Sequence, residues 1–171
     1  IMRFWIAAVV TLSSANTCLA SDTIILDGQN GKAVERAELP TCENAPYTKA
    51  NCSRAVACLG SEGVYFDGQA HGWDTGIIIG FLNDGTSCQG NWIAGGQDTP
   101  GRASMVCTNG VEANVLYHTL DNETGTVIGS GVDSLGREVL AWSGEKVLQF
   151  LTGPEDTTPS LPCGPAPIPI S

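Results

Sequence analysis

The feature that most constrains the fold is a series of turn signals spaced about 8–12 residues apart along the middle of the chain. Between them lie short stretches rich in glycine, β-branched and aromatic residues. Asn83-Asp84-Gly85, for example, suits a tight hairpin that needs positive φ angles. This spacing is typical of many short antiparallel strands. We therefore predict an all-β fold, an antiparallel sandwich or barrel of about eight strands.

Most of this region, residues 54–152, is assigned to strands, with loops such as the Gly/Pro-containing segment 94–101 between them. We also expect a strand at 23–26 and a short helix within 46–58, because proline is tolerated at a first helical position and Asn44 could cap it. The strands predicted within the body are 55–59, 64–66, 76–82, 87–93, 102–108, 113–119, 124–131, 138–142 and 146–151.

The first twenty residues resemble a secretory signal. Arg3 precedes an apolar run that is shorter than the roughly 20 residues needed to span a bilayer, and small residues follow up to Ala20. We expect cleavage after Ala20 and a periplasmic or secreted mature protein. No later segment is long and apolar enough to predict a membrane span.

The mature chain divides into three segments. Residues 21–53 are polar, 54–152 form the strand-rich body, and 153–171 are rich in proline. Proline favours extended backbone and is excluded from central strands. We therefore expect the tail to lie as a strap across the surface of the body.

Cysteine usage predicts three disulfides. The chain has seven cysteines, and loss of Cys18 with the leader leaves an even number, as in a disulfide framework. No Cys-x2-Cys pair indicates a zinc site, and no phosphate-binding loop is present, so we expect neither metal nor cofactor. Adjacent strands would pair Cys88 with Cys107, and Cys163 would join one of three others. The six cysteines are Cys42, Cys52, Cys58, Cys88, Cys107 and Cys163.

The chain is acidic, with 18 Asp and Glu against 8 Lys and Arg and a formal charge of −10. This charge opposes binding to phosphate backbones and to anionic lipid surfaces. We therefore expect no nucleic-acid partner. The charge suits a solvated exported protein, or one that meets a basic partner.

The body also shows an internal duplication with a period of about 49 residues. Each copy contains a cysteine, an aromatic residue, a Thr-Gly-x-apolar-apolar-Gly motif and a tryptophan. Two related hairpin modules would then bury their apolar faces against each other, with the two tryptophans at equivalent core positions. The matched residues include Cys58 and Cys107, Tyr65 and Tyr117, and Trp92 and Trp142.

Segment 71–92 resembles a MORN-type β-hairpin repeat. It has His71-Gly72 near its start, an Asp-Gly turn, and Gly90-Asn91-Trp92 at its end. Cys88 stands where the repeat has an aromatic residue, and the Gly80–Gly85 spacing is shorter than in the repeat. The resemblance implies an interaction surface rather than an enzyme. More broadly, the chain is similar to small Cys/Gly-rich exported proteins of Gram-negative bacteria.

A second resemblance is to periplasmic inhibitors of C-type lysozyme, which are small eight-stranded β-barrels. It rests on the segments 107–110, 115–117 and 143–146, although Val147 stands where the inhibitors have an aromatic residue. The resemblance implies that Ser143 and Lys146 would contact a basic hydrolase.

Catalytic motifs are sparse. Of the two histidines, His71 lies in a turn-like segment near Asp74, and His118 lies in a strand pattern. His71 and Asp74 could form a base and its orienting group, but no Gly-x-Ser-x-Gly motif supplies a nucleophile. Most aspartates lie in turns, where they hydrogen-bond the backbone. We therefore expect a non-enzymatic protein without catalytic residues.

Aromatic residues are the best candidates for ligand contact, because they stack on sugars and anchor protein partners. We predict Trp73, in an exposed turn, together with Tyr65 and Tyr117, and add Ser143 and Lys146 from the inhibitor resemblance. The sequence thus predicts an exported binding or structural module whose partner is an envelope protein or a glycan. Its alternatives are an inhibitor of a basic hydrolase such as lysozyme and a carbohydrate-binding module.

Overall fold

The structure is a computed structural model that describes residues 39–96, 98–121 and 123–171, with the backbone alone at 118–120. The predicted signal at 1–20 and the predicted strand at 23–26 lie outside the described residues. The same holds for most of the polar segment 21–53, of which only the part from residue 39 onward is described.

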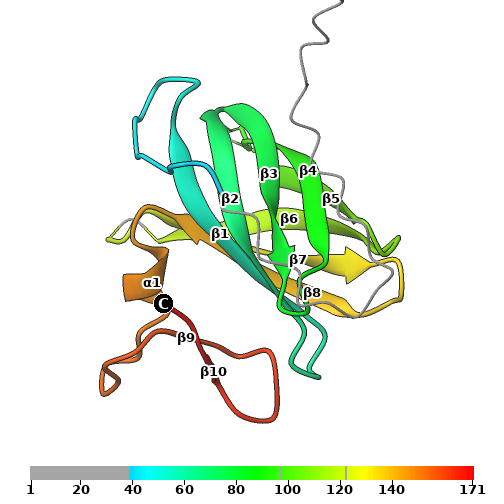
Figure 1. Cartoon of the computed structure of the whole chain (residues 1–171). Coiled ribbons are helices and arrows are strands. Elements are labelled where there is room, and N and C mark those ends of the chain that lie inside the picture. The colour runs from blue at the N-terminus through cyan, green and yellow to red at the C-terminus, as the bar shows by residue number, and fades with distance from the viewer. Residues whose placement is uncertain (1–38, 97, 122) are drawn as a thin grey trace, which may run out of the picture. The chain divides into compact units, whose positions relative to one another are not determined.

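Eight antiparallel strands form a closed barrel in which each strand pairs with its neighbours in sequence and the last pairs with the first (Figure 1). The predicted all-β class and approximate strand number are therefore confirmed, and the barrel replaces the sandwich alternative. The strands are β1 (Cys52–Leu59), β2 (Tyr65–Trp73), β3 (Thr75–Leu82), β4 (Ser87–Ile93), β5 (Gly101–Cys107), β6 (Glu112–Asp121), β7 (Thr126–Asp133) and β8 (Glu138–Gly144).

Tight turns join the strands at one end of the barrel. Gly85, Gly110 and Gly136 adopt φ angles of 89°, 84° and 77°, which side-chain-bearing residues rarely adopt. In the β3–β4 turn, the Asp84 carboxylate accepts a hydrogen bond from the backbone N–H of Thr86. These turns fix the register of the hairpins and hold this end of the barrel compact.

Two local predictions around β1 and β2 are wrong. The sequence predicts that His71 and Trp73 lie in a turn, but both belong to β2, in which Gly68, Ala70 and Gly72 face inward. The helix expected within 46–58 is absent from the structure: turns extend to residue 50 and β1 follows. Both differences have one cause, because β1 and β2 pair with strands on each side and this pairing outweighs local propensity.

The strand expected at 146–151 is also wrong. The structure has a short helix, α1 (Val147–Phe150), immediately after β8. Val147 is buried against the outer face of the barrel, so the apolar residues of this segment pack on the sheet rather than extending it.

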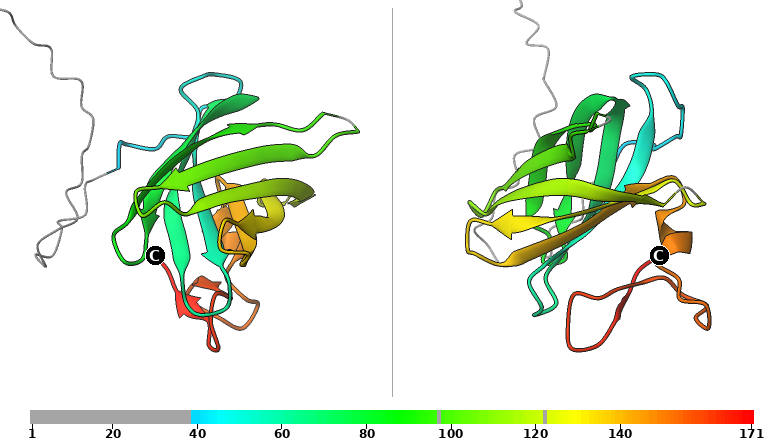
Figure 2. Two further views of the ribbon diagram at one scale, coloured as in Figure 1. Left: turned by 90° about the vertical axis from the view of Figure 1, so that its right-hand side faces the viewer. Right: turned by 180° about the vertical axis from the view of Figure 1, so that it is seen from behind.

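The tail covers the outer face of β1 and β8 (Figure 2). It contains a two-stranded sheet of β9 (Ser160–Leu161) and β10 (Ile168–Pro169). Leu161 and Ile170 are buried with Val56 and Trp142 in this outer cluster. The backbone carbonyl of Ser171 also accepts a hydrogen bond from Arg54.

The two tryptophans that the duplication places in equivalence lie on opposite sides of the barrel wall. Trp92 packs against the interior core, whereas Trp142 belongs to the outer cluster. Cys58 and Cys107 are likewise divided between the outer and inner clusters. The expected equivalence of the two tryptophans is therefore wrong, because a strand residue shifted by one position faces the opposite side of the sheet.

The described residues form three disulfides: Cys42–Cys52, Cys58–Cys163 and Cys88–Cys107. Cys88 lies directly opposite Cys107 in the β4–β5 register, which is the pair expected from the sequence. Three disulfides fit an oxidising compartment. Among the described residues, no helix is long and apolar enough to cross a membrane.

Candidate functional site

The two ends of the barrel interior differ in how they are filled. At the closed end, where the tight turns lie, large side chains occupy the interior. Leu59, Phe66 and Leu82 come from the first three strands, and Val139 comes from β8. The Cys88–Cys107 disulfide lies at the same end. Together they leave this end packed as an ordinary protein core.

An ion pair with a buried carboxylate also lies at the closed end. Asp133 is 6% exposed and accepts hydrogen bonds from the backbone N–H groups of Leu135 and Arg137 and from the Arg137 guanidinium. Burial alone would raise the pKa of the Asp133 carboxyl, but these hydrogen bonds and the guanidinium charge outweigh it, so the pKa lies below its ordinary value. The carboxylate thereby ties the β7–β8 turn to the barrel.

At the open end, a cavity of about 940 Å³ enters the barrel between the strands. Small inward-facing residues line its walls, including Ser53 from β1, Ala70 from β2, Gly101 from β5 and Ser143 from β8. The hydroxyl oxygens of Ser53 and Ser143 are 3.2 Å apart and share a hydrogen bond. Because none of these side chains is large, the interior is left unfilled here. We call this cavity the mouth.

Two aromatic residues form part of the wall of the mouth. Trp92 lies opposite Gly76, where an added Cβ would come within 2.8 Å of the indole nitrogen. That nitrogen donates a hydrogen bond of 3.0 Å to the His71 carbonyl oxygen. A side chain at position 76 would therefore collide with the indole nitrogen and with the His71 carbonyl group.

The second aromatic residue is Tyr117, which is paired with Gly101 on one side and Gly129 on the other. A Cβ at either glycine would lie about 3.0–3.2 Å from the tyrosine ring, so the ring rests closely on both neighbouring strands. Burial raises the pKa of Tyr117 to about 12.

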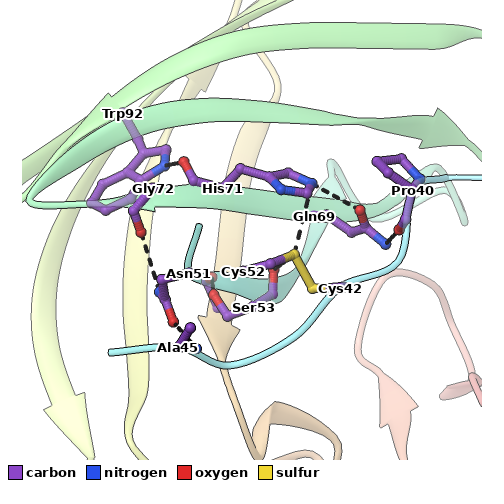
Figure 3. The surroundings of a disulfide bond; sticks show 11 residues. Pro40, Cys42, Ala45, Asn51, Cys52, Ser53, Gln69, His71, Gly72 and Trp92 are labelled. Atoms are coloured by element: carbon purple, nitrogen blue, oxygen red, sulfur yellow. Dashed lines mark hydrogen bonds between the residues drawn. A yellow bond between two sulfur atoms is a disulfide. The ribbon is translucent and has the colours of Figure 1, made fainter. Parts of the chain in front are cut away.

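A disulfide-closed segment, residues 42–52, lies beside the mouth (Figure 3). The Cys42–Cys52 bond joins its two ends. The Asn51 side chain donates to the Gly72 carbonyl oxygen and accepts from the Ala45 N–H, at 3.2 and 2.9 Å. These contacts attach the segment to the end of β2 and define its position.

His71 lies on β2 next to this disulfide (Figure 3). Its Nε2 atom is 2.9 Å from the Gln69 side-chain oxygen and 3.7 Å from the Cys52 sulfur. Burial lowers the pKa of His71. Within the described part of the chain, His71 has no hydrogen bond to Asp74 or to a serine, so the base and orienting group considered from the sequence are not brought together. The side chain of His118 lies outside the described residues.

The rim of the mouth carries an aromatic pair and three carboxylates. The rings of Tyr47 and Trp73 are 4.7 Å apart between centroids and inclined at 44°. Asp74, Asp98 and Glu145 line the opening and are exposed. No lysine or arginine is found among the described residues that line it.

The candidate residues predicted from the sequence divide between this site and other places. Trp73, Tyr117 and Ser143 line the mouth. Tyr65 lies at the opposite end of the barrel and packs against the outer cluster, and Lys146 is exposed at the start of α1 without lining the cavity. Trp73 ends β2 rather than lying in a turn, and it is partly buried. Sequence reasoning missed Ser53, Ala70 and Tyr47, and assigned Trp92 to the core alone.

A second hollow of about 950 Å³ lies on the outer face of the barrel. Its floor includes Asn91, Ser104, Asn114 and Ser130 from four neighbouring strands. It is bounded by the outside of the sheet alone, whereas the mouth is surrounded by strands and by the disulfide-closed segment. The mouth therefore encloses a ligand more completely.

Comparison with known proteins finds similar solved structures but no matching family. No family model and no curated protein matches the chain. It is similar to the solved structure of a de novo designed fluorescence-activating β-barrel, with 16% identity over 55% of this chain and 90% of that one, and a TM-score of 0.44. It is also similar to a redesigned β-barrel, mFAP1, bound to DFHBI, with 17% identity over 56% and 94%, and a TM-score of 0.44.

Proposed function

We propose that this protein is an exported, non-enzymatic binding module that takes a small, largely apolar ligand into the mouth of the barrel. One observation carries the proposal: a cavity of about 940 Å³ enters one end of an otherwise packed barrel. Its volume falls in the range of small-molecule sites, and the mouths of β-barrels are a recurrent place for them. Eight strands enclose an interior just wide enough for side chains or for one small ligand.

The chemistry of the wall supports an apolar ligand with a few polar groups. Trp92, Tyr117 and Val127 offer apolar surface, and burying ligand surface against them gains roughly 25 cal/mol per Å². The Ser53–Ser143 hydroxyl pair supplies a polar contact that can orient the ligand. Such a mixture of apolar wall and isolated polar groups is typical of small-molecule sites.

The export and non-enzymatic parts of the proposal have separate support. Three disulfides favour an oxidising compartment, in agreement with the signal-like leader. The mouth contains hydroxyls and carboxylates, but its described residues do not combine a base, an orienting group and a nucleophile in hydrogen-bonding contact. Binding is therefore a better use of this cavity than catalysis.

Two alternative functions have less support from the structure. A carbohydrate-binding role is favoured by the Tyr47–Trp73 pair, in which Tyr47 is exposed and Trp73 partly buried, although the two rings are inclined rather than coplanar. The inhibitor role expects a protruding 143–146 loop, and this segment is instead the end of β8 and a short turn into α1.

Equilibrium binding of a neutral apolar dye, Nile red, tests the proposal. We expect Ser53→Leu to weaken binding about tenfold or more, because the added side chain occupies the mouth. Ser104→Leu is the matched control, since it adds the same group on the outer face. Both variants should keep the circular dichroism spectrum of the parent. Unchanged dye affinity in Ser53→Leu, or loss in Ser104→Leu, contradicts the proposal.

A further inference from the structure

We propose that the ligand of the mouth is an amphipathic organic cation, with its apolar body inside the barrel and an ammonium group at the rim. This inference rests on the proposed function, because it names the chemical class of the ligand for the same site. It depends on three features of the rim, namely its charge, its aromatic pair and its fixed geometry.

The first feature is charge of one sign. Asp74, Asp98 and Glu145 line the opening from three different loops, and no described lysine or arginine lines it. Lys49 and Lys146 lie in the neighbouring turns but do not contribute to the lining. A positive group at the rim would therefore meet carboxylates, whereas an anion would be repelled.

The second feature is the aromatic pair. Trp73 lines the mouth, and the Tyr47 ring lies 4.7 Å from it while remaining 84% exposed. The ring faces of tryptophan and tyrosine attract cations, and recognition of ammonium groups by aromatic side chains is a frequent use of this attraction. Asp74 follows Trp73 directly in sequence, so an aromatic face and a carboxylate are adjacent.

The third feature is the fixed geometry of these residues. Tyr47 and Asp74 adopt positive φ angles of 66° and 60°, which are uncommon for residues other than glycine. The Cys42–Cys52 disulfide and the Asn51 hydrogen bonds to both segments hold them in place. Backbone strain of this kind tends to occur at functional sites, and a rim held in place loses less entropy on binding.

Three matched probes test the inference: 1-naphthylmethylammonium, 1-naphthylmethanol and 1-naphthoate, titrated into the whole protein at low salt. They share one aromatic body and differ in charge. We expect the cation to bind about tenfold more tightly than the alcohol and the anion to bind most weakly. The preference should fall as salt rises, because the rim carboxylates are exposed.

Variants at the rim show which residues cause the preference for the cation. Asp74→Asn should lower the ratio of cation to alcohol affinity about fivefold, and Asn tolerates the positive φ of this position. Tyr47→Leu should lower the same ratio while retaining apolar bulk. Asp84→Asn is the control, because it removes one charge from the turn at the closed end.

The outcomes separate the two proposals. If none of the probes binds, or if binding is unaffected by Ser53→Leu, the mouth is not the site and both proposals fail. If all three probes bind equally and Ser53→Leu weakens them equally, the mouth is a ligand site but the cationic class is wrong. A cation preference that Asp74→Asn and Asp84→Asn reduce equally also overturns it, since it then comes from the net charge alone.

Discussion

The open and closed ends of this barrel are built from the same eight strands but differ in side-chain size. At the closed end, leucine, valine and phenylalanine fill the interior, and a disulfide and a buried carboxylate join the strands. At the open end, serine, alanine and glycine leave a cavity. The strand pairing is continuous through both ends, so the cavity does not depend on a broken sheet.

This difference indicates a division of roles. The closed end contributes most of the packing that stabilises the fold, and the open end is free to carry a site because the barrel does not depend on filling it. Substitutions at the two ends should therefore have unequal effects on the free energy of unfolding.

Loss of disulfides should show the largest difference. Cys58–Cys163 links residues 105 apart and joins the tail to β1, whereas Cys42–Cys52 links residues 10 apart beside the mouth. From loop-closure entropy we expect removal of the first pair, as a double Cys→Ala variant, to cost about 4–5 kcal/mol, and removal of the second about 2–3 kcal/mol. Chemical denaturation measures both, and equal losses would contradict the assignment of the tail bond as the main covalent restraint.

Truncation of single side chains should show the next difference. Leu59 is 0% exposed at the closed end, so Leu59→Ala should destabilise the protein by about 2–5 kcal/mol. Val127 lines the mouth and is partly buried, so Val127→Ala should cost about 1 kcal/mol or less. Urea unfolding midpoints provide the comparison. A larger loss from Val127→Ala would show that the open end is a packed core.

Acid titration separates two aspartates at opposite ends. The folded-state pKa of Asp133 lies below its ordinary value, so its stabilisation is present above pH about 4 and is lost as pH falls through the folded-state pKa. We expect Asp133→Asn to cost about 1–3 kcal/mol at pH 7 and much less near pH 2.

Asp121, at the open end, provides the comparison. A hydrogen bond from the Thr124 hydroxyl lowers the pKa of the Asp121 carboxyl, but Asp121 is only partly buried and has no charged partner among these contacts, so Asp121→Asn should have a smaller effect. Thermal unfolding across the acid range checks both variants. The comparison fails if the two variants lose stability equally at pH 7.

Alkaline titration should give the smallest effect. The pKa of Tyr117 is raised to about 12, so above pH about 10 the unfolded chain releases this proton first and stability falls until the folded-state pKa is reached. Tyr117→Phe should remove about 1 kcal/mol of this loss at pH 11. The free energy of unfolding measured at pH 9 and pH 11 tests this. An identical fall in the parent protein and in Tyr117→Phe would show that the phenol of Tyr117 is solvent-exposed.

Much of the fold could be predicted from the sequence, because turn chemistry and short β-rich runs are local signals. The β3–β4 hairpin with its Asn83-Asp84-Gly85 turn is a direct example. The full length of β2 could not be predicted, because glycines alternating with polar residues are typical of turns. This segment is a strand because it pairs with neighbouring strands. The apolar residues of segment 147–150 are compatible with a strand or with a helix. The segment forms a helix because it packs on the outer face of the barrel directly after β8.

The site could be predicted only in part. Trp73, Tyr117 and Ser143 were candidates because their side chains carry recognisable chemistry, and all three line the mouth. Ser53 and Ala70 carry no such signal, since a small residue marks a cavity only after the strands close around it. Tyr47 meets Trp73 through a disulfide-closed segment, and this long-range placement is not encoded in local spacing.

Amide chemical shifts during titration with 1-naphthylmethanol test the central claim most directly, namely that only one end of the barrel receives a ligand. The largest shifts should fall on Ser53, Gly101 and Ser143, while Leu59 and Val139 stay unmoved. Shifts centred on Ser104 and Asn114 of the outer face, or at the closed end, would contradict it.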